Sequence, residues 1–95
     1  MFRLEITARY LRDFERLAPE TRKVLLKKAE LLLQNPYREK RLTHPHKIVF
    51  RMRFSDRGAD KRLIYVVKGD TISLLAICDR KHGYDDLYAI LRGGA

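Results

Sequence analysis

The stretch that decides the fold is KRLIYVVKGDTISLLAICDRKHGYDDLY, which runs from Lys61 to Tyr88. Two apolar segments, Leu63–Val67 and Thr71–Cys78, flank Gly69-Asp70, a dipeptide that favours a two-residue β-hairpin turn. The second segment is largely apolar on both faces, with Ile72, Leu74, Ala76 and Cys78 on one face and Ser73, Leu75 and Ile77 on the other. It is therefore predicted to be a central strand, covered by helices on one side.

The residues before this stretch predict a strand followed by two helices. Phe2 to Ile6 alternates between apolar and polar side chains, which is typical of a strand with one buried face. Thr7 can cap a first helix, and Pro19 suits the first position of a second helix because its missing N–H costs nothing there. Asn35-Pro36 ends the second helix, since a residue before proline avoids the helical region. Residues 8–34 are thus expected to form a helical hairpin.

The middle of the chain predicts one more strand between two irregular segments. Tyr37 to Lys47 contains proline and basic residues without periodicity and is expected to be a loop. Ile48 to Phe54 alternates again, and Ser55 to Asp60 is expected to be a turn. With a short final helix at Tyr84 to Leu91, the order is β-α-α-β-β-β(-α). This pattern predicts an α+β fold, a single domain over residues 1–95, in which the helical hairpin packs on a small antiparallel sheet.

The charge of the chain is high and unevenly distributed. The net charge is +9, from 21 Lys and Arg against 12 Asp and Glu, and Pro36 to Arg62 holds nine bases and three acids. Clustered positive charge favours a polyanionic partner, either nucleic acid or an acidic protein, over the alternative of a merely solvated surface. No apolar run is long enough to span a bilayer. The single cysteine, Cys78, lies in an apolar run, so an intracellular, reduced protein is expected.

Three arginines form the first candidate site. Arg51 and Arg53 are two residues apart on one strand, so both side chains leave the same face. Arg62 opens the next strand, which the sheet is expected to place beside them. Arginine binds phosphate through paired hydrogen bonds and stays charged at any working pH, so this group suits an anionic ligand. A solvated strand face is the alternative interpretation.

The polar residues after the last strand form the second candidate. Arg80, Lys81, His82 and Tyr84 follow that strand almost directly, and Tyr88 lies one helical turn further on. Histidine titrates near neutrality and can transfer protons, and surrounding cations favour the phenolate of a tyrosine. The alternative is that Arg80 and Lys81 only neutralise neighbouring aspartates. Residue types alone leave open which of His82, Tyr84 and Tyr88 acts as the base.

These segments together resemble the RelE/ParE superfamily of bacterial type II toxins. The resemblance rests on R-M-R-F at 51–54, K-R-L-I-Y at 61–65 and D-R-K-H-G-Y-D-D-L-Y at 79–88. The start of the chain also fits, with A-R-Y-L-R-D-F-E-R-L at 8–17 followed by a longer helix that ends in N-P. The similarity covers nearly the whole chain and is closest to the RelE-like branch.

The resemblance implies a cytoplasmic toxin that cleaves mRNA in the ribosomal A site without a metal or other cofactor. It implies two partners, a cognate antitoxin protein and the mRNA and ribosomal RNA of the A site, and no membrane. The catalytic residues it implies are Arg51, Arg53, Arg62, Arg80, His82 and Tyr88. Further basic residues expected to hold RNA are Lys47, Arg57, Lys61 and Lys81.

Two other functions fit the same fold. One is a ParE-like poison of DNA gyrase that performs no hydrolysis. The other is a basic RNA-binding relative without catalytic activity. A convergent group of Arg, His and Tyr favours the nuclease over both.

Overall fold

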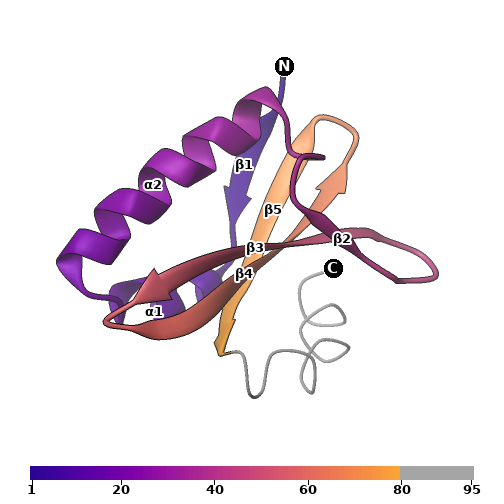
Figure 1. Ribbon diagram of the computed structural model, residues 1–95. Helices are drawn as coiled ribbons and strands as arrows, with labels where there is room; N and C mark the ends of the chain where they lie inside the picture. Colours follow the sequence, from indigo (N-terminus) through magenta and orange to yellow (C-terminus); the bar gives the residue numbers. More distant parts are fainter. Residues whose placement is uncertain (80–95) are drawn as a thin grey trace.

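The computed structural model describes residues 1–79, and the helix expected at Tyr84 to Leu91 lies outside them. Seven elements make up the described chain (Figure 1). They are β1 (Arg3–Ile6), α1 (Ala8–Glu15), α2 (Pro19–Gln34), β2 (Lys40–Leu42), β3 (Ile48–Asp56), β4 (Ala59–Lys68) and β5 (Thr71–Asp79). The α+β class and the order of the elements are confirmed, with one strand more than expected.

The strands form one five-stranded sheet in the order β1-β5-β4-β3-β2. β2 to β5 run antiparallel to their neighbours, whereas β1 is parallel to β5, so the sheet is mixed and β5 is central as predicted. The additional strand, β2, lies in the segment expected to be a loop. Its three residues are too few to show alternation, and it is a strand because Lys40 and Leu42 pair with Arg51 and Val49.

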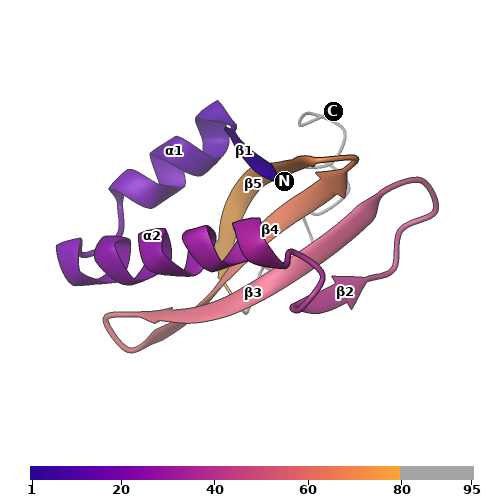
Figure 2. The same ribbon diagram turned by 90° about the horizontal axis from the view of Figure 1, so that it is seen from above.

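Both helices lie on the same side of the sheet, which Figure 2 shows from above. They bury an apolar stripe against the strands, to which the helices contribute Tyr10, Leu25 and Leu32 and their connection contributes Leu17. The predicted ends of the helices are confirmed. Thr7 Oγ1 accepts a hydrogen bond from Tyr10 N at 3.1 Å, α2 begins at Pro19, and Asn35 is extended. The helix layer therefore covers one face of the sheet and not the opposite face.

A β-bulge changes which residues of β5 share that opposite face. Ile64 of β4 pairs with Ala76, but the next residue, Tyr65, pairs with Leu74, so Leu75 is an additional residue in β5. The prediction that Ala76 and Cys78 lie on the same face as Ile72 and Leu74 is therefore wrong, because one extra residue reverses every later side chain. Ala76 and Cys78 instead belong to a second buried cluster, away from the helices, with Val49, Ile64 and Leu75.

Two tight turns set the length of the long strands. Arg57 and Gly58, with φ of 50° and 80°, form the whole connection between β3 and β4, as expected for a hairpin turn with two positive φ angles. Gly69, with φ of 60°, and Asp70 connect β4 to β5, as predicted. The turn expected over Ser55 to Asp60 is thus shorter than predicted. Asp60 lies in β4 opposite Ser55, and its side chain belongs to the sheet.

Candidate functional site

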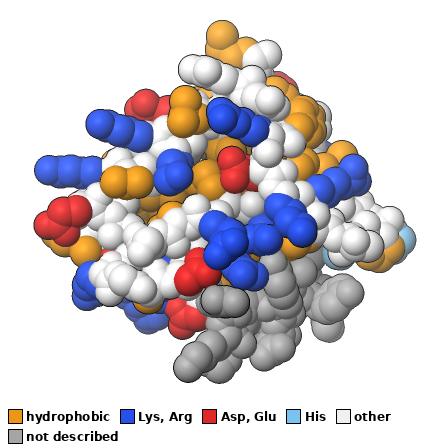
Figure 3. All heavy atoms as spheres, in the orientation of Figure 1, with side chains coloured by type: hydrophobic (Ala, Val, Ile, Leu, Met, Phe, Trp, Pro, Cys, Tyr) orange, Lys and Arg blue, Asp and Glu red, His pale blue; other side chains and the backbone are white. Residues whose placement is uncertain are grey.

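Two of the predicted arginines lie directly opposite each other. Arg53 of β3 and Arg62 of β4 are cross-strand partners, so their side chains leave the sheet side by side, on the face away from the helices. Like charges in this arrangement repel, and an anion bound between them relieves the repulsion. A group of Lys and Arg side chains is visible near the middle of the molecular face in Figure 3.

Arg51 extends this basic face along β3. It lies two residues from Arg53 and pairs with Ile64 on one side and with Lys40 of β2 on the other. The Nε atoms of Arg51 and Arg62 are shielded from solvent, so part of each side chain is buried. Lys40 is exposed and joins the face only because β2 exists. Sequence reasoning missed Lys40, since a three-residue edge strand has no signal of its own.

A carboxylate lies within the same face. Asp60 Oδ2 accepts a hydrogen bond from Arg53 Nη2 at 3.1 Å. The side chain of Arg53 is 58% exposed and that of Asp60 is 28% exposed. An ion pair this accessible to water is weak, so Arg53 can exchange this partner for another anion.

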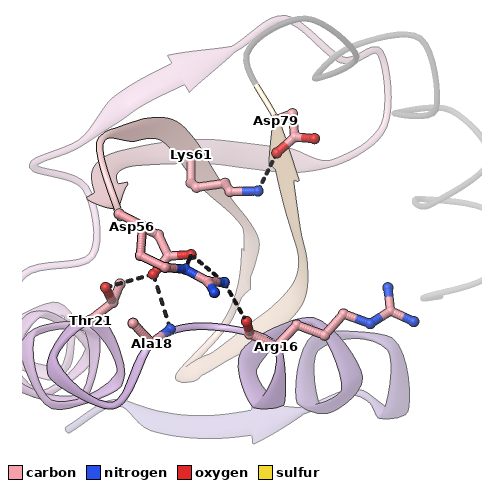
Figure 4. Close-up of polar contacts among 7 residues, drawn as sticks. Arg16, Ala18, Thr21, Asp56, Lys61 and Asp79 are labelled. Carbon is pink, nitrogen blue, oxygen red and sulfur yellow. Dashed lines mark hydrogen bonds and ion pairs between the residues drawn. The ribbon is translucent and has the colours of Figure 1, made fainter.

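Lys61 and Arg57 lie on other surfaces. Lys61 points to the helix side of the sheet, where it forms an ion pair with Asp79, its partner across β4 and β5 (Figure 4). Arg57 lies in the β3–β4 turn, where it donates to Asp56 Oδ2 at 3.2 Å and to the carbonyl oxygen of Arg16 at 2.9 Å. Both border a cleft of about 310 Å³ between α1 and the ends of β3, β4 and β5.

Asp56 organises the floor of this cleft. Its Oδ1 accepts hydrogen bonds from Ala18 N at 3.0 Å and Thr21 Oγ1 at 2.7 Å (Figure 4). These two bonds, together with the neighbouring Arg57 guanidinium, hold the pKa of the Asp56 carboxyl below its ordinary value despite burial. The carboxylate thus ties the turn beside the arginine face to the junction between the two helices.

Lys47 lies at the far end of the sheet. Six residues of extended chain separate it from Arg53, a distance of about 20 Å. It borders a hollow of about 420 Å³ whose other lining residues include Tyr37, His46 and Lys68. The structure therefore does not bring Lys47 together with the arginine pair.

The predicted tail residues Arg80, Lys81, His82, Tyr84 and Tyr88 lie outside the described residues. The strand that leads to them ends at Asp79, and its last residues run beside the start of β4. Cys78 is the cross-strand partner of Arg62, so residue 80 follows two positions after a residue that flanks the arginine pair.

Within residues 1–79, no group of three or more His, Cys, Asp or Glu side chains is placed to hold a metal ion. The rings of His44 and His46 lie 6.2 Å apart, and His44 Nδ1 accepts hydrogen bonds from the backbone N–H groups of His46 and Lys47. No helix in this part of the chain is long and apolar enough to cross a membrane.

Comparison with known proteins identifies the fold. No family model and no curated protein matches the chain. Among solved structures, a chain of the intact E. coli RelBE toxin–antitoxin complex matches with a TM-score of 0.70 and 20% identity, over 83% of this chain and 96% of that one. An arginine double mutant of E. coli toxin RelE in the free state matches with a TM-score of 0.75 and 18% identity, over 97% and 95%. The isolated E. coli RelE toxin matches with a TM-score of 0.70 and 19% identity, over 97% and 98%. The chain has the RelE fold, which confirms the predicted resemblance at the level of the fold.

Proposed function

We propose that this chain, which has the fold of E. coli RelE, is the toxin of a type II toxin–antitoxin system and an mRNA endoribonuclease that acts on the ribosome. The observation that carries the proposal is the direct pairing of Arg53 with Arg62 on the face of the sheet away from the helices. Each guanidinium offers a planar fork of N–H donors that matches the oxygens of a phosphodiester, and here two of them lie side by side.

The reaction in this proposal is cleavage of RNA through its own 2′-hydroxyl. A base removes the 2′-hydroxyl proton, the 2′-oxygen attacks phosphorus, and the bond from phosphorus to the 5′-oxygen breaks. The products are a 2′,3′-cyclic phosphate and a 5′-hydroxyl, whose proton comes from an acid. His82, Tyr84 or Tyr88 supplies the proton transfers, since arginine is always protonated.

The arginines act on charge in this scheme. Negative charge accumulates on the phosphate oxygens as the 2′-oxygen attacks, and donors that are already in place stabilise it without reorganisation. Arg53 and Arg62 are held by the β3–β4 ladder, and Arg51 sits one pleat further along the same strand. The Nε of Arg51 has no hydrogen-bond partner among residues 1–79, so a bound phosphate would give a shielded donor its acceptor.

The partners follow from the same face. A cognate antitoxin that inhibits the protein would cover Arg51, Arg53 and Arg62 with acidic residues, since this blocks phosphate and neutralises like charges together. The similar chain from E. coli was solved in a toxin–antitoxin complex, which supports a protein partner of this kind. Ribosomal RNA in the A site is the second partner. The protein would bind both partners in the cytoplasm.

Expression in bacterial cells with mapping of mRNA 5′ ends tests the proposal. Wild-type protein is expected to arrest growth and to produce cuts in phase with codons. Arg62→Ala, His82→Ala and Tyr88→Ala are each expected to abolish the cuts. Arg12→Ala is the matched control, because Arg12 is exposed on α1, on the helix side of the sheet. Growth arrest with DNA-damage signalling and intact mRNA would refute the nuclease in favour of a gyrase poison.

A further inference from the structure

Asp60 is an acidic residue inside a basic face. Its Cα partner is Ser55, which places the Asp60 carboxylate two residues along the ladder from the Arg53–Arg62 pair and on the same side of the sheet. Its Oδ2 lies 3.1 Å from Arg53 Nη2. Within residues 1–79, Arg53 is the residue that donates a hydrogen bond to this carboxylate. The contact exists because the β3–β4 turn has only two residues.

The position of Asp60 has an electrostatic consequence for the arginines. Arg53 and Arg62 repel each other as directly opposed like charges, and the Asp60 carboxylate offsets this repulsion in the free protein. A phosphate group carries the same sign of charge and offers oxygen acceptors to the same guanidinium. Phosphate and Asp60 therefore compete for Arg53.

We propose that Asp60 is a built-in competing anion that sets the affinity of this face for RNA. The RNA backbone reaches Arg53 by displacing the Asp60 carboxylate, and each binding event exchanges one anion for another. The inference rests on the proposed function, because it takes the arginine face as the site for RNA phosphate. It requires neither cleavage nor a ribosome, so it is tested on the protein with RNA alone.

The experiment measures binding of a short single-stranded RNA oligonucleotide by Asp60→Asn over a series of salt concentrations. Because an exposed ion pair is weak, the Kd is expected to fall by roughly two- to fivefold relative to wild type. The plot of log K against log salt is expected to steepen by up to about 0.7, the increment for one more phosphate neutralised on a single strand. A purely structural role for Asp60 would leave this slope unchanged.

Asp70→Asn is the matched control for charge. Asp70 lies in the β4–β5 turn, its side chain is 71% exposed, and its carboxylate is 4.0 Å from Arg3 Nε. The Asp70→Asn substitution removes the same charge as Asp60→Asn, but at the other end of β4, about 30 Å away. At that distance salt screens the Asp70 carboxylate from the arginine face. Affinity and slope are expected to stay near those of wild type. Asp60→Glu, which keeps the carboxylate, is also expected to stay near wild type.

Arg53→Ala completes the test. In the Arg53→Ala variant, the gain in RNA affinity from Asp60→Asn is expected to be no larger than the gain from Asp70→Asn, because Asp60 acts through Arg53. In the protein that retains Arg53, equal effects of Asp60→Asn and Asp70→Asn on RNA affinity would overturn the inference. Weaker RNA binding by Asp60→Asn than by wild type would also overturn it, because Asp60 would then align Arg53 for RNA. RNA binding too weak to measure in both wild type and Asp60→Asn would overturn it as well. A different result would refute the nuclease proposal alone. In that case Asp60 would still compete with RNA for Arg53 in the binding experiment, but mRNA would stay intact in cells that express the protein.

Discussion

The hydroxyl of Tyr65 donates a hydrogen bond to the carbonyl oxygen of Pro36 at 2.7 Å. Tyr65 is fully buried in β4, and its ring stacks on Phe50 of the neighbouring strand, with ring centroids 5.4 Å apart. Pro36 follows the last turn of α2, so this bond fastens the end of the helix layer to the centre of the sheet. The tyrosine of the L-I-Y segment is therefore a structural residue of the helix side, not a member of the arginine face.

Tyr65→Phe is expected to lower stability without changing RNA binding. It removes one buried hydrogen bond and leaves the Pro36 carbonyl without that donor, at a cost of about 1 kcal/mol. For a domain of this size the Tm is expected to fall by about 4–8 °C. Thermal unfolding followed by circular dichroism measures this. Tyr37→Phe is the control, since Tyr37 is exposed and its hydroxyl makes no hydrogen bond within residues 1–79. An equal Tm for the two variants would contradict the assignment.

Asp56 is expected to give the protein a stability that falls in acid. Its folded pKa lies below the ordinary 3.8, so the folded state binds this proton less readily than the unfolded state. The resulting stability is fully present above the unfolded pKa and is lost as the pH falls through the lower folded pKa. Denaturant unfolding of wild type and Asp56→Asn between pH 2 and pH 6 measures it. The variant is expected to be less stable at pH 6 and to differ less at pH 2.

A constant difference between wild type and Asp56→Asn over this range would refute that linkage. Asp70→Asn serves as the control, because Asp70 is exposed at the opposite end of the sheet. Its stability curve is expected to follow that of wild type at each pH.

The parts of the fold that follow local rules could be predicted from the sequence. Thr7, Pro19 and Asn35-Pro36 mark helix ends through their own backbone and side-chain chemistry, and Gly69 marks a turn through its positive φ. The alternation of β3 showed which residues share a face. That Arg62 lies on the strand beside Arg51 and Arg53 was also inferred, because consecutive strands joined by a short turn are neighbours, but its direct pairing with Arg53 was not.

Features that depend on pairing between distant residues could not be predicted. The bulge at Leu75 lies in β5 directly after its pairing with β1 ends at Leu74, and no single segment of the sequence shows it. The strand β2 exists only through its contact with β3. The Asp60–Arg53 ion pair was missed for a related reason, since a turn expected to span Ser55 to Asp60 left Asp60 outside the sheet. Apart from β2, which is an element that the sequence did not predict, these errors concern which residues face one another.

Asp13 is expected to hold the end of β5 in place. Its Oδ2 accepts a hydrogen bond from Ile77 N at 2.9 Å, beyond the point where β1 ends its pairing with β5 at Leu74. Asp13→Ala removes the acceptor for a backbone N–H next to the site, at a cost of about 1–3 kcal/mol. Hydrogen exchange of the Ile77 amide is expected to accelerate more than that of Ile72. Asp13→Asn keeps an oxygen acceptor, so the Ile77 amide is expected to stay protected from hydrogen exchange in this variant. Unchanged exchange in Asp13→Ala would show that the strand end is held by other contacts.

Lys40 is expected to belong to the proposed RNA-binding face although β2 is an edge strand. A lysine at a sheet edge often serves only to prevent pairing with another chain, and that role predicts no effect on RNA. Lys40 is, however, the cross-strand partner of Arg51, which places a fourth cation on the arginine face. Lys40→Ala is expected to weaken binding of a single-stranded RNA several-fold and to reduce the salt slope by about 0.7. Lys23→Ala is the control, because Lys23 is exposed on α2, in the helix layer. Equal affinities for the two variants, with aggregation of Lys40→Ala alone, would assign Lys40 to edge protection and limit the face to its three arginines.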